Sequence, residues 1–177
     1  MRPLVEADPD LSHALLPLLD ARAVLYTTYR ELDRRVKQAA SRDEACLHFM
    51  AIPGVGPIAA LTFRAAVDDP SRFTSSRTVA AHFGLTPRRY QSGEKDNPGR
   101  ISKAGDSDVG ATLYSAANAM MMRSIAGSEI KSWGLRLMRR KGRRRAVVAV
   151  ARKLAVIMHR MWADCTEFRH EPLKGAA

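Results

Sequence analysis

Residues 46–63 read CLHFMAIPGVGPIAALTF, and this stretch predicts two helices joined by a tight turn. Gly54 and Gly56 allow the backbone to reverse where a Cβ atom would interfere. Pro57 suits the first position of the second helix, because that position needs no amide hydrogen. The turn leaves free backbone N–H groups at a helix N-terminus, where a phosphate binds well. Gly54, Val55 and Gly56 are therefore candidate nucleic-acid contacts, although a plain turn between two helices remains the alternative.

A second stretch, TPRRYQSGEKDNPGRISKAG at residues 86–105, is rich in residues that break regular structure. Its two prolines, three glycines and one asparagine predict an irregular, exposed backbone and not a helix or a central strand. Long irregular segments inside a domain are usually functional or disordered, and the net charge of +3 here favours function. The side chains that make this segment a candidate collar for a phosphodiester backbone are Arg88, Arg89, Lys95, Arg100 and Lys103.

The basic charge is concentrated in one part of the chain. Of the net charge of +11, residues 1–45 contribute −1, so residues 46–177 carry +12. The densest run is RRKGRRR, which contains Arg139, Arg140, Lys141, Arg143, Arg144 and Arg145. Such a run is usually a solvated surface, but six cations without an acid repel one another unless an anion is near. This distribution favours a nucleic-acid partner over a soluble protein that is merely basic.

Residues 10–40 predict one long helix, with Asp10 as its cap. Its apolar positions alternate at spacings of three and four residues, interrupted only by Arg22, and they are Leu15, Leu18, Leu25, Tyr29, Leu32, Val36 and Ala39. This is a coiled-coil pattern, and it predicts a homo-oligomer formed through this helix. An ordinary amphipathic helix that folds onto its own domain remains an open alternative.

The rest of the sequence also favours helices. Aromatic residues make up only 6% of the chain, and helical periodicity predicts helices over residues 77–83, from about 107, over 129–140 and over 146–165. We therefore expect a mostly α-helical protein: a long N-terminal coiled-coil-like segment (1–44), a compact helical domain (45–168) and a tail (169–177).

Two further features concern the cellular compartment. Cys46 and Cys165 have no paired spacing, so we expect buried thiols in a reducing compartment. The first ten residues contain no signal-like apolar run, and no clean apolar stretch approaches the roughly 18 residues that a bilayer span needs. We expect a cytoplasmic protein with no membrane partner.

Three blocks together resemble the C-terminal domain of the insertion-sequence 110/116/902 family of bacterial transposases. They are IPGVGPIAAL (52–61), FGLTPRRYQSGEKDNPGRISKAGD (83–106) and ARKLAVIMHRMWADCTEF (151–168). Their order, and the spacing from GL through SG and RISK to GD, make the resemblance specific over about residues 46–168. The turn IPGVGP is in addition similar to the helix-hairpin-helix element of DNA-binding proteins. One departure is Val109-Gly110 after the GD pair, where the family often carries Leu-Arg.

The resemblance implies a DNA recombinase guided by an element-encoded RNA, so DNA and a guide RNA are the expected partners. The family's SG serine falls on Ser92, which implies that Ser92 attacks DNA and forms a covalent 5′-phosphoserine link. The surrounding cations suit this role, because they can stabilise charge that develops on the attacked phosphate.

Family members also carry an N-terminal RNase H-like domain with four acidic residues that bind magnesium. This chain begins near the family's coiled coil, so no such acidic set can be transferred to it. We expect no cofactor and no metal site on this chain alone, and magnesium in the complete family enzyme. A disrupted element, a start assigned too late and an excised domain all remain open.

The leading hypothesis is DNA transposition, in which this chain supplies Ser92 to a composite active site and is inactive without the metal-binding domain. The alternative is a non-catalytic, dimerising helix-hairpin-helix module that binds nucleic acid. A helix-hairpin-helix glycosylase would need a catalytic Asp or Lys after the hairpin, and no supporting motif accompanies Asp68 or Asp69.

Overall fold

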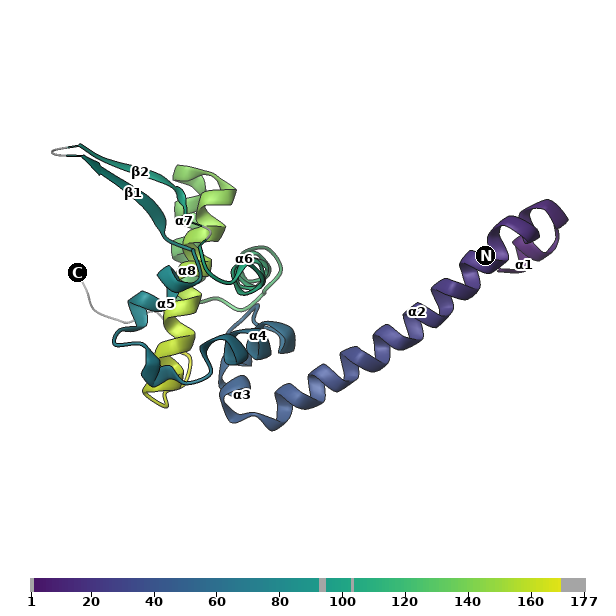
Figure 1. Ribbon diagram of the computed structural model, residues 1–177, viewed down its shortest axis with the longest axis horizontal. Helices are drawn as coiled ribbons and strands as arrows, with labels where there is room; N and C mark the ends of the chain where they lie inside the picture. Colours follow the sequence, from purple (N-terminus) through teal and green to yellow (C-terminus); the bar gives the residue numbers. More distant parts are fainter. Residues whose placement is uncertain (1, 93–94, 103, 170–177) are drawn as a thin grey trace. The chain divides into compact units, whose positions relative to one another are not determined.

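The computed structural model describes residues 2–92, 95–102 and 104–169, with only the backbone described at residues 2, 88–92 and 95–100. It is mostly α-helical, as the sequence predicts, and it divides into two units, Met1–Ala39 and Ala40–Ala177. The elements, in chain order, are α1 (Arg2–Glu6), α2 (Pro9–Arg42), α3 (Glu44–Met50), α4 (Pro57–Val67), a 3-10 turn η1 (Pro70–Arg72), α5 (Ser76–His82), β1 (Pro87–Ser92), β2 (Lys95–Ile101), α6 (Ser107–Met122), α7 (Glu129–Lys141) and α8 (Arg143–Ala163), as labelled in Figure 1.

The long helix α2 dominates the first unit and confirms the helix expected over residues 10–40. Asp8, and not the expected Asp10, is the residue that caps it. The Asp8 Oδ1 atom accepts hydrogen bonds from the backbone N–H groups of Asp10 (3.0 Å) and Leu11 (3.2 Å). The helix begins earlier than expected because Pro9, with its fixed φ angle, is well suited to the first helical position.

Helix α8 is the centre of the second unit, where it packs against α5, α6 and α7 (Figure 1). Apolar residues recur at helical spacing in the sequence of α8, and all are buried except Ile157, which is only partly covered; the buried ones are Val147, Val150, Leu154, Met158 and Met161. The apolar residues that recur at helical spacing in α6 are buried as well, namely Val109, Leu113, Ala116, Ala117, Met120 and Met121. The core therefore follows the 3.6-residue periodicity of both helices.

Helices α3 and α4 flank a turn at residues 51–56, in agreement with the predicted helix-hairpin-helix arrangement. Phe49 on α3 and Phe63 on α4 meet edge to face, with ring centroids 5.4 Å apart. Cys46 on α3 is buried as expected, and burial together with the nearby Asp43 carboxylate raises the pKa of its thiol to about 12. The expectation was wrong for Cys165, which is exposed because it follows the end of α8.

The segment expected to be irregular contains an antiparallel β-hairpin. Strand β1 pairs with β2 in a register that sets Tyr90 opposite Asn97 and Ser92 opposite Lys95, with an irregularity between Pro87 and Arg89. Proline is excluded from central strands because it has no backbone N–H to donate to the neighbouring strand. In a two-stranded sheet both strands are edges, so β2 accommodates Pro98 opposite Arg89.

Among the described residues, no helix is both long and apolar enough to span a lipid bilayer.

Candidate nucleic-acid interface

The two ends of the hairpin segment are fixed at the C-terminus of α5. Gly84 has a positive φ of 65°, and the backbone N–H groups of Gly84 and Leu85 donate to the carbonyl oxygens of Ala81 and Ala80. This is the glycine-terminated helix end known as a Schellman motif, and Gly84 is the residue that ends α5. At the other end, a Cβ atom on Gly105 would lie 1.9 Å from the carbonyl oxygen of His82. Only glycine fits there, so the segment returns to the helix it left.

Asp106 then starts helix α6. Its Oδ1 atom accepts hydrogen bonds from the backbone N–H groups of Asp108 (2.8 Å) and Val109 (3.2 Å), so Asp106 is the N-cap of α6. The base of the hairpin is thereby held between the end of α5 and the start of α6, and the strands project away from the helices (Figure 1).

The candidate nucleophile Ser92 is the last residue of β1, paired through the backbone with Lys95, the first residue of β2. Arg88 and Arg89 lie on β1 and Arg100 on β2. The structure thus gathers these positions on one two-stranded ribbon, while their side chains lie outside the described part. Lys103 lies outside the described residues altogether.

The turn between α3 and α4 gives its three candidate residues three different environments. A Cβ atom on Gly54, whose φ is 91°, would lie 2.6 Å from the backbone N of Met120 and 2.7 Å from the carbonyl oxygen of Ala116. Val55 is buried in the core. Gly56, by contrast, caps α4 without a side-chain hydrogen bond, and a Cβ atom there would meet nothing within 4 Å. Of the three, only Gly56 lies open to a ligand at the α4 N-terminus.

The start of α3, on the other side of this turn, is held by Asp43. The Asp43 Oδ1 atom accepts a hydrogen bond from the backbone N–H of Cys46 (2.8 Å), and its Oδ2 atom lies 3.4 Å from Arg64 Nε. Burial raises the pKa of Asp43, but the Cys46 hydrogen bonds and the Arg64 charge outweigh it, so the pKa lies below its ordinary value. This carboxylate links α3 to α4 as an anion at neutral pH.

The basic run from Arg139 to Arg145 spans the junction of two helices. The first three cations occupy the last turn of α7, the last three occupy the first turn of α8, and Gly142, with a φ of 81°, separates the helices. All six cationic side chains are exposed. Among the described side chains none of the six forms an ion pair, and the one hydrogen bond is from Arg143 to the Asn118 side-chain oxygen, at 2.9 Å.

Helix dipoles act in opposite senses on the two halves of this run. Cations at the C-terminal turn of α7 are stabilised by the dipole, whereas the three arginines at the N-terminal turn of α8 face its positive end. Each unfavourable placement costs about 0.3–1 kcal/mol at a solvated site. A bound polyanion would remove this cost, which favours a ligand-binding role for the run.

Helix α6 connects the candidate elements. The turn at Gly54 contacts the α6 backbone at Ala116 and Met120, and Arg143 bonds to Asn118 on the same stretch. The base of the hairpin lies at Asp106, 12 residues away along the chain, or about 18 Å along the helix axis at 1.5 Å per residue. The structure therefore brings the helix-hairpin-helix turn and the basic run to the same part of α6, with the hairpin at its other end.

The described side chains do not fit a magnesium site. No group of three or more His, Cys, Asp and Glu residues among them lies close enough to hold a metal ion. Asp106 uses its carboxylate to cap α6.

Sequence reasoning missed a set of exposed cations around Trp133, contributed by Arg77, Arg152 and Lys153. Arg77 lies on α5, Trp133 on α7, and the consecutive residues Arg152 and Lys153 on α8, so the sequence gives no sign that the three helices meet here. The available signal was weak: Arg145, Arg152 and Lys153 recur at spacings of seven and eight residues, which is one side of a helix.

Comparison with known proteins supports the resemblance seen in the sequence. A family model described as "Transposase IS116/IS110/IS902 family" matches residues 46–133. The chain is 36% identical over 137 residues to the transposase for insertion sequence element IS1111A of Coxiella burnetii, a match that covers 77% of this chain and 37% of that protein. It is 30% identical over 153 residues to the transposase for insertion sequence element IS1328 of Yersinia enterocolitica, covering 86% of this chain and 46% of that protein. The chain thus spans less than half the length of these relatives.

Proposed function

Because this chain belongs to the IS116/IS110/IS902 family of transposases, we propose that it acts in DNA transposition and that Ser92 is its nucleophile. The observation that carries the proposal is the location of Ser92 at the end of β1, directly opposite Lys95, on a ribbon with cationic residues in both strands. The ribbon is anchored through Gly105 and the capped start of α6, so its base has a fixed position relative to the core.

The chemical step is a transesterification. The Ser92 Oγ atom attacks phosphorus, a new Oγ–P bond forms, and the bond to the deoxyribose 3′ oxygen breaks. The serine proton passes to a base and the departing 3′ oxygen ends as a hydroxyl, leaving DNA joined to the protein through a 5′-phosphoserine. Attack on this ester by a 3′ hydroxyl of another strand restores the serine, so each ester bond broken is replaced by another.

Binding of the phosphodiester backbone is assigned to the cationic residues. The strand residues Arg88, Arg89, Lys95 and Arg100, with Lys103 beyond them, would contact the strand being attacked. The exposed run at residues 139–145 would hold DNA farther along, and the open α4 N-terminus at Gly56 would donate backbone N–H groups to a phosphate. Basic residues outnumber acidic residues in these segments, which is consistent with a polyanionic ligand.

Cleavage is expected to need a second component. The described side chains of this chain offer no metal site, so no catalytic step is assigned to a metal held here. A protein that supplies the RNase H-like domain of the family, together with a guide RNA, would complete the active site. We expect the purified chain, given magnesium and supercoiled plasmid, to bind DNA without breaking it. Breakage that requires Ser92 and no partner would contradict the composite-site proposal.

The decisive experiment traps the covalent intermediate in the reconstituted complex. A nicked substrate prevents religation, so a serine adduct accumulates and can be located by mass spectrometry. Ser92→Ala should abolish the adduct and leave DNA affinity within about twofold, since the substitution removes one hydroxyl and no cation. Ser107→Ala, at an exposed serine, is the matched control and should keep the adduct. An adduct in the Ser92→Ala protein would assign the nucleophile elsewhere.

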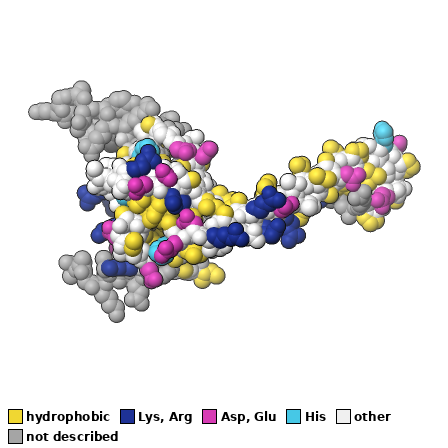
Figure 2. All heavy atoms as spheres, turned by 60° about the horizontal axis from the view of Figure 1, so that its bottom comes forward, with side chains coloured by type: hydrophobic (Ala, Val, Ile, Leu, Met, Phe, Trp, Pro, Cys, Tyr) yellow, Lys and Arg dark blue, Asp and Glu magenta, His cyan; other side chains and the backbone are white. Residues whose placement is uncertain are grey.

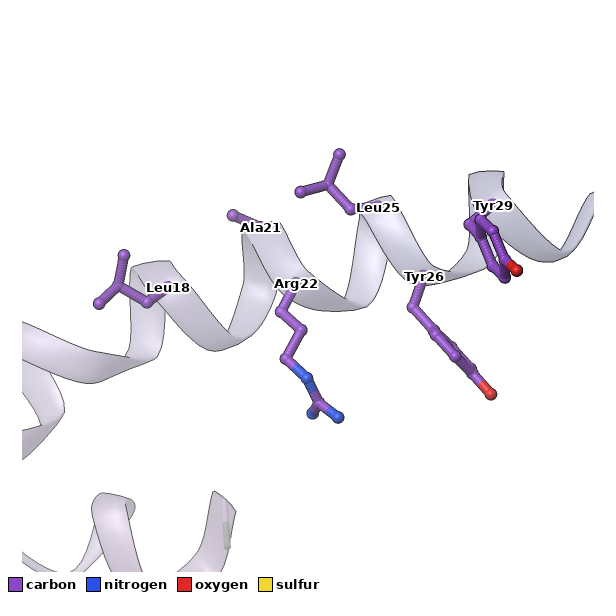
Figure 3. A pocket seen from close by; sticks show the side chains of 6 residues that line it. All are labelled: Leu18, Ala21, Arg22, Leu25, Tyr26 and Tyr29. Carbon is purple, nitrogen blue, oxygen red and sulfur yellow. The ribbon is translucent and has the colours of Figure 1, made fainter. Parts of the chain in front are cut away.

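We further propose that the chain self-associates through α2. Four leucines recur at spacings of seven residues, and each is exposed: Leu11, Leu18, Leu25 and Leu32. Figure 3 shows Leu18, Ala21 and Leu25 projecting from one side of the helix, with Arg22 and Tyr26 on the other. In Figure 2 hydrophobic side chains lie on the surface along α2 beside Lys and Arg side chains. A second copy of α2 would cover this line as in a coiled coil.

Sedimentation of two variants tests self-association. Leu25→Lys inserts a charge into the leucine line and should convert a dimer to a monomer. Val24→Lys is the matched control, because Val24 is 67% exposed and Leu25 71% exposed, but Val24 lies off that line. Equal sedimentation of the two variants would remove the leucines from the interface.

The alternative function is a non-catalytic, dimerising helix-hairpin-helix module that binds nucleic acid. The observation in its favour is the open α4 N-terminus at Gly56, which needs no chemistry to bind a phosphate. DNA binding and dimerisation without any Ser92 adduct in the reconstituted complex would select this alternative.

A further inference from the structure

A hollow of about 550 Å³ lies on the second unit and is lined by residues other than those assigned above. Its lining comes from three elements that pack together: Arg77 from α5, Trp133 from α7, and Arg152 and Lys153 from α8 (Figure 1). The half-buried side chains of Ala149, Val156 and Ile157 supply the apolar part of the lining. Because these α8 positions lie three and four residues apart, they form one continuous face.

The aromatic wall of this hollow has a fixed position. Next to Trp133, Gly134 is buried, and a Cβ atom there would lie 2.6 Å from Cγ2 of Val150. Glycine therefore allows α7 to approach α8 closely beside Trp133. Trp133 itself packs partly against the core, so one part of the ring is held while another lines the hollow.

The charge of the lining is entirely positive. Arg77, Arg152 and Lys153 are exposed, and no carboxylate of the described residues lines the hollow. Among the described residues neither guanidinium has an ion-pair or side-chain hydrogen-bond partner. The Lys153 ammonium lies over the Trp133 ring, 4.3 Å from its centroid. An adjacent hollow that shares Lys153 is different, because its charges are mixed: Glu129, Asp164 and Glu167 line it together with Arg160 and Arg169.

An aromatic ring within a group of unpaired cations is the combination that binds single-stranded nucleic acid. The cations attract the phosphates, and the ring stacks on a base regardless of its sequence. Stacking of a base on an aromatic side chain is stronger than the contact of an exposed lysine with the same ring, so a base can displace the ammonium. In a duplex both faces of each base are already stacked, so only an unpaired base can use this ring.

We propose that this hollow binds an unpaired nucleotide of single-stranded DNA or RNA. The base stacks on Trp133 in place of the Lys153 ammonium. Lys153, Arg77 and Arg152 then contact the phosphates on either side. The inference rests on the proposed function to the extent that the partner is nucleic acid, but it assigns a second site that binds strands in their unpaired form.

Intrinsic tryptophan fluorescence tests the site directly. In the Trp162→Phe variant, Trp133 is the single tryptophan, and stacking should quench its emission. Titration with 16-nucleotide oligo(dT) and oligo(U) should quench it, while a 16-base-pair duplex that binds equally well by anisotropy should not. The oligonucleotide that binds with the higher affinity shows whether the site takes single-stranded DNA or RNA. Binding of both without quenching, or equal quenching by the duplex, would overturn the proposal.

Affinity measurements are a second test of this site. Trp133→Leu should weaken oligo(dT) or oligo(U) binding by about 5- to 150-fold, the range that corresponds to the loss of one stacked base. Trp133→Phe should keep much of the wild-type affinity for the oligonucleotide, because Phe retains an aromatic face. Duplex affinity should stay unchanged in both variants. Duplex binding with no effect of Trp133 on single strands would refute this site alone, whereas a chain that binds no nucleic acid would refute the proposed function as well.

Discussion

Gly54→Ala isolates the role of the helix-hairpin-helix turn in folding. Alanine is strained at a φ of 91°, at a cost of about 1–2 kcal/mol. Its Cβ atom would lie 2.6 Å from the backbone N of Met120 and 2.7 Å from the carbonyl oxygen of Ala116. These are backbone atoms of α6, so the turn must move away from the helix, which costs about 1–3 kcal/mol more, as in other overpacked cores. The expected destabilisation is about 2–5 kcal/mol.

Gly56→Ala is the control for this prediction. Gly56 has a φ of −98°, which any residue adopts, and a Cβ atom there would meet nothing within 4 Å. The free energy of unfolding should therefore change by less than about 1 kcal/mol.

Thermal and urea denaturation followed by tryptophan fluorescence is a suitable assay, because Trp133 and Trp162 both lie in the second unit. Each kcal/mol of destabilisation should lower the thermal unfolding midpoint by roughly 3–5 °C for a unit of this size. Equal stability of Gly54→Ala and Gly56→Ala would refute the contact with α6. The comparison also matters for DNA binding: a binding defect in Gly56→Ala reports on a phosphate contact, whereas one in Gly54→Ala reports on folding.

Three further predictions concern charge. Replacing Arg143 and Arg144 by Ala should reduce the slope of log affinity against log salt by roughly 0.7–0.9 for each phosphate that is no longer neutralised, and an unchanged slope would exclude the basic run from the interface. Asp43→Asn keeps the α3 cap but loses the charge, so urea titrations should find it less stable than wild type at pH 7 by under about 1 kcal/mol. The pKa of Asp43 is lowered in the folded chain, so this difference should be present above the ordinary Asp pKa and disappear as pH falls through the lowered value. A thiol reagent at pH 8 should modify exposed Cys165 quickly and buried Cys46, whose pKa is raised to about 12, only on unfolding; equal rates would contradict this.

The core was predictable because it depends on periodicity. The buried positions of α6 recur at helical spacing, and Gly84 and the Gly54–Pro57 turn mark where helices stop and start. Such local sequence signals directly predict which helix faces are buried and where helices end.

The hairpin was missed because its composition suggested irregular structure. Pro98 and Gly99 exclude a central strand but permit an edge strand, and a ribbon of two strands consists of edges alone. A local signal was present, since Gly93-Glu94 is a Gly-X dipeptide of the kind that joins strands in two-residue hairpins. The strands lack the alternation of apolar residues that would have supported it.

The hollow at Trp133 was not predictable for a different reason. It depends on which helices pack together, and Arg77 is 56 positions from Trp133 in the sequence. Arg152 and Lys153 are adjacent in the sequence, but two cations are too few to stand out as a charge run, and Arg77 lies far from them along the chain. The seam of α2 was predictable in outline, and the line of exposed leucines at spacings of seven extends it to Leu11 at its N-terminal end.

The way the hairpin joins the core has an evolutionary consequence. The chain leaves α5 at Gly84 and returns at Gly105 to the same helix end. The length and sequence of the hairpin between them therefore do not affect how the remaining helices connect. A longer, shorter or differently charged ribbon could replace this one between Leu85 and Gly105 without shifting any core residue. Mobile elements whose target sites diverge could therefore change the ribbon that we propose to contact DNA while inheriting the scaffold unaltered. Chimaeras that exchange residues 86–104 between relatives should fold as well as their parents.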